Sequence, residues 1–199
     1  MYSLKGSIYN FKKKRSKYYA NERYVTQQLL KSLSHRQYAV ISDLLLPNDG
    51  QFRTSQIDHL IISIYGIFCI ETKSHKGWIF GSKARRLFKQ ILFRNSFRLT
   101  PNPVEQNNSH IRTVRGLIGE RLKAPIVNIV VFPSAERFFI NGYEDVGSVN
   151  DMIESVFRYG EKVYSYEEAS KMIEVICQFN IKRPIEHLKH IERVRAVHV

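Results

Sequence analysis

Residues 56–73 read QIDHLIISIYGIFCIETK. Two runs rich in β-branched residues, 57–64 and 67–73, stand on either side of Tyr65-Gly66. Apolar runs of this length, separated by two residues that include a glycine, are typical of a β-hairpin. The sequence therefore predicts two antiparallel strands here, joined by a two-residue loop.

Polar side chains gather on one face of this predicted hairpin. A loop formed by Tyr65-Gly66 places Asp58 opposite Lys73. Side chains alternate between the two faces of a strand, so His59 and Thr72 point away from them. The shared face then carries four polar residues, which are Gln56, Asp58, Glu71 and Lys73.

Two carboxylates and an ammonium group on an otherwise apolar hairpin indicate a metal-assisted hydrolytic centre. Neighbouring carboxylates repel each other unless a cation neutralises them, and oxygen ligands suit Mg²⁺ or Mn²⁺. Asp58 and Glu71 are the expected ligands. The metal would polarise a phosphate, while Lys73 would orient or deprotonate the attacking water. A plain salt bridge between Lys73 and one of the acids is the alternative.

Residues 16–33 are predicted to form an amphipathic helix, because Val25, Leu29 and Leu33 recur at helical spacing. Glu22 lies on the same stripe, at the N-terminal end of the helix. Its carboxylate is therefore expected on the side that faces the core. A first-turn charge favoured by the helix dipole is the alternative explanation of Glu22.

The remaining elements follow from similar patterns. Further strands are expected over residues 38–46, 78–80, 126–132, 138–140 and 146–149, and further helices over residues 102–122, 150–159, 166–179 and 184–197. No pattern assigns residues 83–100. This order predicts an α/β fold in which helices flank a mixed sheet. We divide the chain into a basic N-terminal arm (1–18), a main domain (19–149) and a C-terminal helical extension packed on it (150–199).

Composition narrows the class of protein. A chain of 199 residues can form one ordinary globular core. Cys69 and Cys177 stand far apart in apolar runs, which predicts free thiols in a reducing compartment. The longest apolar stretch, residues 60–70, is well short of the roughly 20 residues that span a bilayer, and no secretory signal is visible. We therefore expect a cytoplasmic protein without a membrane part.

The positive charge is regional. The net charge is +13, and residues 1–123 hold 22 Lys and Arg against 7 Asp and Glu, whereas residues 124–199 hold 9 against 11. A local positive field favours polyanions with closely spaced phosphates, through counterion release. Nucleic acid is thus the leading partner. An anionic lipid surface or simple solubility is the alternative explanation of the charge.

The motifs resemble those of a known family. They are Gln56-Ile57-Asp58-His59, Gly66-Ile67-Phe68, Ile70-Glu71-Thr72-Lys73 and, later, Asn102-Pro103 with Gln106. Together they are similar to the nuclease-related domain, called NERD, of the restriction-endonuclease-like PD-(D/E)xK superfamily, over about residues 21–132. The resemblance implies a restriction-endonuclease-like mixed β-sheet flanked by helices, and a metal-dependent nuclease. A tryptophan that such domains often carry has no counterpart here, the nearest positions being Leu87 and Phe88.

The resemblance also implies roles for single residues. Asp58 and Glu71 match the acids that bind Mg²⁺ or Mn²⁺, and the backbone carbonyl of Thr72 is expected as a further ligand. Lys73 matches the catalytic lysine. Glu22 matches an acid of the first helix that can hold a second metal or a bridging water. Gln56 matches a residue that borders the site.

Substrate contacts are expected along the basic middle of the chain. Residues 72–104 contain eight Lys and Arg and no Asp or Glu, with aromatic residues between them. The candidates, besides Gln56, are His75, Lys76, Arg85, Arg86, Gln106 and His110. DNA is favoured over RNA. An accessory module that binds nucleic acid without cutting it, or one that docks a protein through the C-terminal helices, is the alternative, and the oligomeric state is left open.

Overall fold

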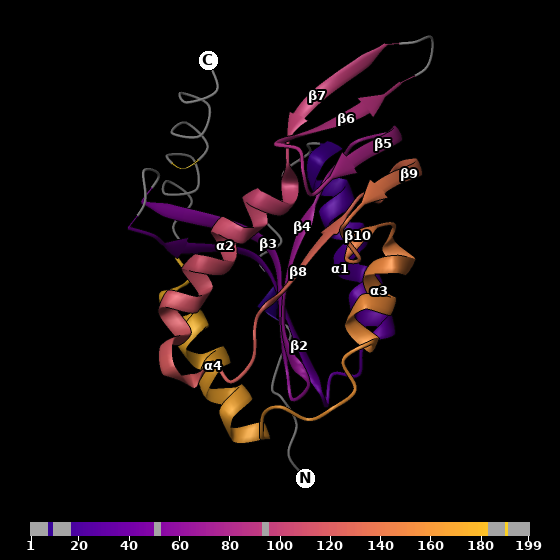
Figure 1. The fold of residues 1–199 in the computed structure, drawn as a ribbon. Coiled ribbons are helices and arrows are strands. Elements are labelled where there is room, and N and C mark those ends of the chain that lie inside the picture. The colour runs from indigo at the N-terminus through magenta and orange to yellow at the C-terminus, as the bar shows by residue number, and fades with distance from the viewer. Residues whose placement is uncertain (1–7, 10–16, 50–52, 93–95, 183–189, 191–199) are drawn as a thin grey trace.

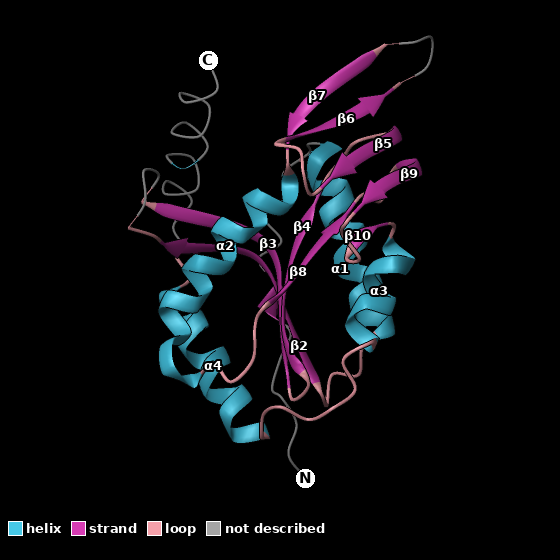
Figure 2. Ribbon diagram, viewed as in Figure 1, coloured by secondary structure: helices cyan, strands magenta, loops and turns pink. Residues whose placement is uncertain are grey.

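The computed structural model describes residues 8–9, 17–49, 53–92, 96–182 and 190. Its elements form three layers, in which a mixed sheet of six strands lies between two pairs of helices (Figure 1). A second sheet, of four strands, extends from one end of the first (Figure 2). The α/β class with helices flanking a mixed sheet is confirmed, while the second sheet was not expected.

The six-stranded sheet has the order β1-β2-β3-β4-β8-β10. Its strands are β1 (Ile8–Tyr9), β2 (Tyr38–Pro47), β3 (Thr54–Ser63), β4 (Gly66–Thr72), β8 (Val127–Val131) and β10 (Val146–Gly147). β3 runs antiparallel to β2 and β4, and β4 runs parallel to β8. Every residue of β4 is buried, because this strand is central and helices cover both faces of the sheet.

Helices α1 (Lys17–Ser32) and α3 (Val149–Phe157) cover one face, and α2 (Pro103–Ile118) and α4 (Tyr166–Phe179) cover the other (Figure 1). A 3-10 turn, Gly119–Arg121, follows α2. The predicted stripe of α1 is buried against the sheet through Val25, Leu29 and Leu33. On the opposite face, α2 and α4 pack side chains such as Val114 and Met172 against the same strands. Each face of the sheet thus has its own apolar core.

The β3–β4 hairpin differs from the predicted register by two residues. Ser63 pairs with Gly66, so Ile64 and Tyr65 form the loop. The Ser63 hydroxyl accepts hydrogen bonds from the N–H groups of Tyr65 and Gly66, at 3.1 Å each. Gly66 has a φ of 154°, which only glycine adopts readily. The predicted turn was therefore wrong, but a shift of two residues leaves each side chain on its predicted face.

The second sheet contains the stretch that sequence patterns left unassigned. Its order is β7-β6-β5-β9, formed by β5 (Gly77–Ser82), β6 (Leu87–Ile91), β7 (Phe97–Pro101) and β9 (Ala135–Asn141). One face of this sheet packs on the main body, where Ile79 and Phe88 meet Val130 and Phe132. The other face points away from the main body.

Asn102 joins the second sheet to α2. It caps this helix, its side-chain oxygen accepting a hydrogen bond from Val104 N–H at 3.0 Å. Its side-chain amide donates to the carbonyl of Arg85 at 3.2 Å and to the Tyr143 hydroxyl at 2.9 Å. Its backbone N–H donates to the carbonyl of Arg86 at 2.9 Å. One residue thus fixes the β5–β6 turn to the start of α2.

The two ends of the chain are only partly described. Ile8–Tyr9 pairs in parallel with β2, so two residues of the expected N-terminal arm are part of the six-stranded sheet. The other residues of the arm before Lys17, and most of the helix expected over residues 184–197, lie outside the described residues. None of the described helices is long and apolar enough to cross a membrane.

Candidate active site

The main sheet forks where β3 and β4 part. The ladder between these strands ends at the pair of His59 with Ile70, although β3 stays paired with β2 up to Thr54. One step beyond the ladder stand Asp58 and Glu71. The Asp58 carboxylate accepts a hydrogen bond from Thr72 N–H at 2.7 Å. Two carboxylates from neighbouring strands therefore lie at the fork. The predicted register placed Asp58 opposite Lys73, whereas the observed register brings it level with Glu71.

Glu71 is the most enclosed acid of this site, with 4% of its surface exposed. Its Oε1 lies 2.7 Å from the Lys73 ammonium, and its Oε2 lies 3.4 Å from His110 Nε2. Burial raises the pKa of Glu71, but the Lys73 ammonium and the nearby His110 ring outweigh burial and hold this pKa below its usual value. Glu71 is therefore the carboxylate that keeps its negative charge.

Helix α2 supplies further partners of this centre. Gln106 accepts a hydrogen bond from Lys73 Nζ at 2.7 Å, and His110 Nδ1 lies 2.6 Å from the Ser55 hydroxyl. Gln106 and His110 are four residues apart, so they share one face of the helix. Both were predicted as substrate contacts, and the structure places them directly against Lys73 and Glu71. Ser55 was not predicted.

The other two acids have the opposite electrostatic balance. Burial and the charges of Glu71 and Glu22 raise the pKa of Asp58 well above its usual value, although the Thr72 N–H and Lys73 act against them. Burial and the charges of Asp43 and Glu71 raise the pKa of Glu22 to about 7. The structure thus brings Glu22, from the start of α1, within electrostatic reach of both strands. This cluster carries more negative charge than its own residues neutralise.

Asp43 is a neighbour of the cluster that sequence patterns missed. It lies on β2, where the pairs of Ser42 with His59 and Leu44 with Ile57 flank it, and its φ is 55°. Its carboxylate accepts a hydrogen bond from the Gln56 side chain at 3.1 Å. The available signal was an isolated carboxylate in an otherwise mostly apolar strand. The structure thus places Gln56 beside Asp43.

His59 connects α1 to the strands behind the acids. Its Nε2 lies 3.0 Å from the Thr26 hydroxyl and 3.1 Å from the carbonyl of Glu22, and its Nδ1 lies 3.5 Å from the Thr72 hydroxyl. Burial lowers the pKa of His59 to about 4, so the ring is neutral at pH 7. These contacts hold the N-terminal part of α1, and with it Glu22, against β3 and β4.

The remaining predicted contacts lie further from the fork. His75 follows β4, with its ring centroid 5.9 Å from that of Phe132. Lys76 is exposed, and its carbonyl accepts a hydrogen bond from Gln90 at 2.8 Å. Arg85 and Arg86 are exposed at the β5–β6 turn, to which Asn102 is bound. The structure therefore does not bring these four side chains into contact with Asp58 or Glu71.

The donor set at the fork fits a divalent cation of the Mg²⁺ type. In the described part of the chain, no three side chains of His, Cys, Asp or Glu are arranged so that they could hold a metal ion together. Mg²⁺ does not require such a group, because it commonly binds through one or two carboxylates and completes its shell with water and phosphate oxygens. Burial first, and then the neighbouring carboxylates, raise the pKa values of Asp58 and Glu22, and a cation would offset the repulsion between these carboxylates.

The fold and the arrangement of the fork define a class. An acid on one strand, followed on the next strand by Glu71-Thr72-Lys73, in a mixed sheet flanked by helices, is the arrangement of the restriction-endonuclease-like PD-(D/E)xK proteins. The sequence pattern of the nuclease-related domain family matches residues 17–133. The chain belongs to this family, as its motifs indicated.

A comparison with curated proteins finds a related chain in Bacillus anthracis. This uncharacterized protein is 29% identical over 175 residues, which cover 84% of the present chain and 79% of the relative. No solved structure matches the chain. The family relationship therefore indicates a nuclease-related function and the use of a divalent metal, and it suggests that the chain binds nucleic acid.

Proposed function

We propose that this protein is a metal-dependent nuclease that hydrolyses phosphodiester bonds of nucleic acid, with DNA as the favoured substrate. The observation that supports this most strongly is the position of the Lys73 ammonium, 2.7 Å from the Glu71 carboxylate at the fork that also carries Asp58. The two acids can bind a metal cation beside the fixed ammonium. The metal cation and the ammonium are the two positive charges that would stabilise the transition state of phosphodiester hydrolysis.

Asp58 and Glu71 would hold Mg²⁺ or Mn²⁺, together with the backbone carbonyl of Thr72. Glu22 would serve a second metal or a bridging water. The bound metal would polarise the scissile phosphate and lower the pKa of a coordinated water. The raised pKa of Asp58 supports this assignment, because a bound cation would stabilise the ionised form of a carboxyl group that ionises unfavourably on its own.

Lys73 would orient the attacking water and offset the negative charge that develops on the phosphate. Two acceptors, Glu71 Oε1 and Gln106 Oε1, hold its Nζ at 2.7 Å each. The backbone N–H of Lys73 also donates to the carbonyl of Val131 at 2.8 Å, which ties this residue to β8. The ammonium group is therefore held in place before substrate binds.

A reducing compartment, the cytoplasm, is part of the proposal. Both cysteines of the chain are free thiols, Cys69 fully buried and Cys177 partly buried. Cys69 Sγ lies 3.1 Å from the Asn107 side-chain oxygen, behind the fork. A thiol in that position contributes to packing, and it needs no oxidising environment.

The test is a cleavage assay with labelled single-stranded, double-stranded and circular DNA and with RNA, in Mg²⁺, Mn²⁺ or EDTA. We expect cleavage that needs metal and falls by at least about a hundredfold in Asp58→Ala and Lys73→Ala. Matched controls are Glu120→Ala and Lys162→Ala, which remove exposed side chains of the same charge and should cleave as the wild type does.

The competing function is an accessory module that binds nucleic acid, or a protein, without cutting. The observation in its favour is that Lys73 and His110 already contact both oxygens of Glu71. Intact substrates under every metal condition, with unchanged nucleic-acid binding in Asp58→Ala and Lys73→Ala, would replace the nuclease by this module.

A further inference from the structure

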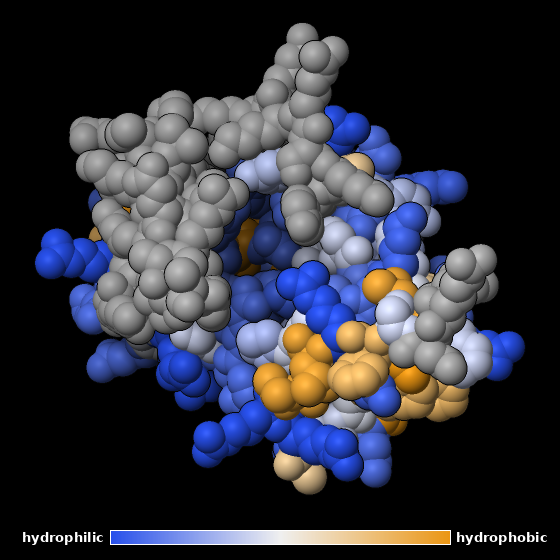
Figure 3. All heavy atoms as spheres, turned by 90° about the horizontal axis from the view of Figure 1, so that it is seen from above, coloured by the Kyte–Doolittle hydropathy of each residue, from blue (hydrophilic) through white to orange (hydrophobic). Residues whose placement is uncertain are grey.

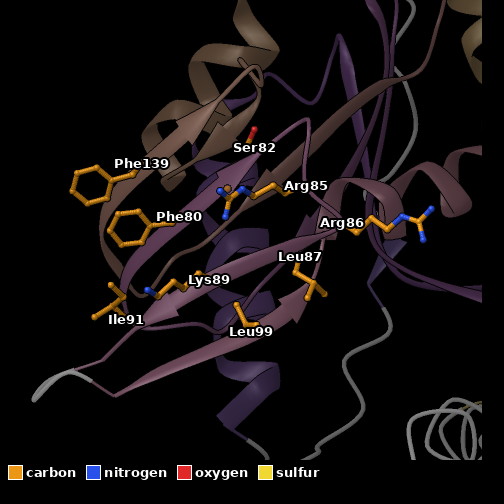
Figure 4. A pocket seen from close by; sticks show the side chains of 10 residues that line it. Phe80, Ser82, Arg85, Arg86, Leu87, Lys89, Ile91, Leu99 and Phe139 are labelled. Atoms are coloured by element: carbon orange, nitrogen blue, oxygen red, sulfur yellow. The ribbon is translucent and has the colours of Figure 1, made fainter.

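The outer face of the second sheet combines aromatic and basic side chains in rows. Because neighbouring strands are in register, residues of one row lie side by side and point to the same face. One row crosses all four strands, from β9 to β7, through Phe139, Phe80, Lys89 and Leu99. The rings of Phe80 and Phe139 stack, with centroids 4.4 Å apart and planes at 6° (Figure 4).

The neighbouring row has the same character. It runs through Arg137, Trp78, Ile91 and Phe97. The Arg137 guanidinium lies 5.2 Å from the centroid of the Trp78 ring, and Lys89 Nζ from the first row lies 4.7 Å from that of Phe97. Each row therefore presents flat rings with a cation next to them.

This apolar surface is exposed. Trp78 is 39% exposed, Phe139 45% and Phe97 62%, whereas Ile79 and Phe88, on the inner face, are buried. Seen from the end of the molecule that carries the second sheet, hydrophobic residues gather into a patch that hydrophilic residues border (Figure 3). Exposed apolar patches of this kind mark sites of interaction.

The charge that lines a recess in this face is of one sign. A recess of about 620 Å³ on this face is lined by Phe80, Leu87, Lys89 and Arg85, among others, and no acidic residue lines it. Figure 4 shows Arg85 and Lys89 in the same recess as the two phenylalanine rings. The surface therefore offers stacking partners and cations together, and it repels other cationic surfaces.

We propose that the outer face of the second sheet binds an unpaired stretch of nucleic acid. This inference rests on the proposed function, and it assigns the substrate a single-stranded segment. Aromatic rings on a sheet stack on exposed bases, and lysine and arginine beside them hold the phosphates. A duplex keeps its bases inside and cannot use the exposed rings, so the apolar part of this face selects against it.

The face is connected to the fork by a short structural path. Asn102 binds the carbonyls of Arg85 and Arg86, and Gln106, which binds Lys73, follows it on α2. Four helical residues correspond to about 6 Å of rise. A nucleic-acid strand that passes the β5–β6 turn therefore lies about one turn of helix α2 away from Lys73.

The direct test uses the chain's single tryptophan, Trp78, as a reporter. Short single-stranded DNA, single-stranded RNA and duplex DNA are titrated into an Asp58→Asn protein in EDTA, where no cleavage occurs. We expect single strands to quench Trp78 emission, because bases stack on or beside the indole, and duplex to leave it nearly unchanged. Comparison of the DNA and RNA titrations identifies the preferred sugar.

Variants in the same background define the surface. Phe80→Ala and Phe139→Ala should each weaken single-strand binding about tenfold, measured by anisotropy of a labelled oligonucleotide. Lys89→Glu should weaken it at least as much, without removing a ring. The controls are Phe179→Ala on α4 and Arg121→Ala in the 3-10 turn that follows α2, both at exposed positions, which should bind as the parent does.

Two results would overturn the inference. One is equal binding of single strands and duplex that none of the three variants changes. The other is a dimer that Phe80→Ala dissociates, without quenching by any oligonucleotide, which would make this face a contact between copies of the chain. Because this test excludes cleavage, its failure leaves the nuclease proposal intact. Selective binding of single strands by a protein that never cuts them would support the binding face and contradict the nuclease proposal.

Discussion

Asp58 and Glu71 each lie one residue beyond the last pair of β3 with β4, yet their surroundings shift their pKa values in opposite directions. Glu71 has a cation on one oxygen and His110 on the other, so the pKa of its carboxyl lies low. Asp58 has only a backbone N–H and the distant field of Lys73 against burial and two negative neighbours, so its pKa lies high. The pair therefore holds one negative charge readily and the second only with help from a cation.

Glu22 allows a test of this electrostatic balance by pH. Its pKa is raised from 4.5 to about 7, so its ionisation lowers the free energy of unfolding as the pH rises from 4.5 through 7. Glu22→Gln removes this loss. We expect the variant to exceed the wild type by about 1–2 kcal/mol at pH 8, and the gain to disappear towards pH 4.5.

Urea denaturation in EDTA at several pH values between 4.5 and 8 measures this difference. Glu120→Gln, at an exposed position, serves as control and should show no pH-dependent gain. A Glu22→Gln protein that is less stable than the wild type at pH 8 would show that Glu22 is ionised and paired in the fold.

At the scale of elements, the N-terminus of α2 connects the two sheets, and Asn102 is its cap. Asn102→Ala removes the cap and leaves the carbonyl of Arg85 and the Tyr143 hydroxyl without their donor. We expect a loss of about 1–3 kcal/mol in the free energy of unfolding, measured in urea.

Asn102→Asp provides the matched comparison. It keeps the capping oxygen and loses the amide donors, so its stability should lie between those of wild type and Asn102→Ala. If the alanine and aspartate variants were equally stable, the cap would contribute nothing, and the bonds to the second sheet would account for the whole loss.

The hairpin illustrates what the sequence could and could not predict. Alternation of side chains along the strands predicted that Asp58 and Glu71 point to the same face. A register shift changes the face only if it is by an odd number of residues, and the observed shift is by two. The register itself depends on local turn chemistry, in which the Ser63 hydroxyl caps the turn and Gly66 joins the ladder. These contacts moved the loop to Ile64 and Tyr65 without exchanging the faces.

Strands β6 and β7 of the second sheet could not be predicted from periodicity, for a physical reason. They lie in a stretch with large apolar side chains on both faces of the sheet, for example exposed Leu87 and buried Phe88 in β6. Alternation of apolar and polar residues, the usual sign of a strand with one wet face, is therefore weak there. Asp43 was missed because its position became significant only when Glu22, from a distant helix, was brought near it.

At the scale of the whole molecule, the excess of basic residues predicts how binding responds to salt. Contacts of Arg85, Arg86 and Lys89 with three phosphates of a single strand would give a slope of about −2 in a plot of log affinity against log salt concentration. Lys89→Ala should reduce the magnitude of this slope by about 0.7. Anisotropy titrations at several salt concentrations measure both values.

Arg121→Ala is the control for this experiment and should leave the slope unchanged. A wild-type slope near zero would mean that the outer face holds its ligand through apolar contacts alone. A slope that Lys89→Ala leaves unchanged would place the phosphates elsewhere on the basic part of the chain.

The chain leaves the main sheet after Lys73, forms β5, β6 and β7 and returns at Asn102. Both ends of this segment therefore lie beside the fork. A segment with both ends fixed can be exchanged as a unit, provided that its replacement restores the two junctions, the pairing with β9 and the packing of Ile79 and Phe88 on Val130 and Phe132. The aromatic and basic residues of the outer face can thus be replaced while Asp58, Glu71 and Lys73 stay in position. For protein engineering, the proposed catalytic centre and the proposed binding face lie on separate sheets.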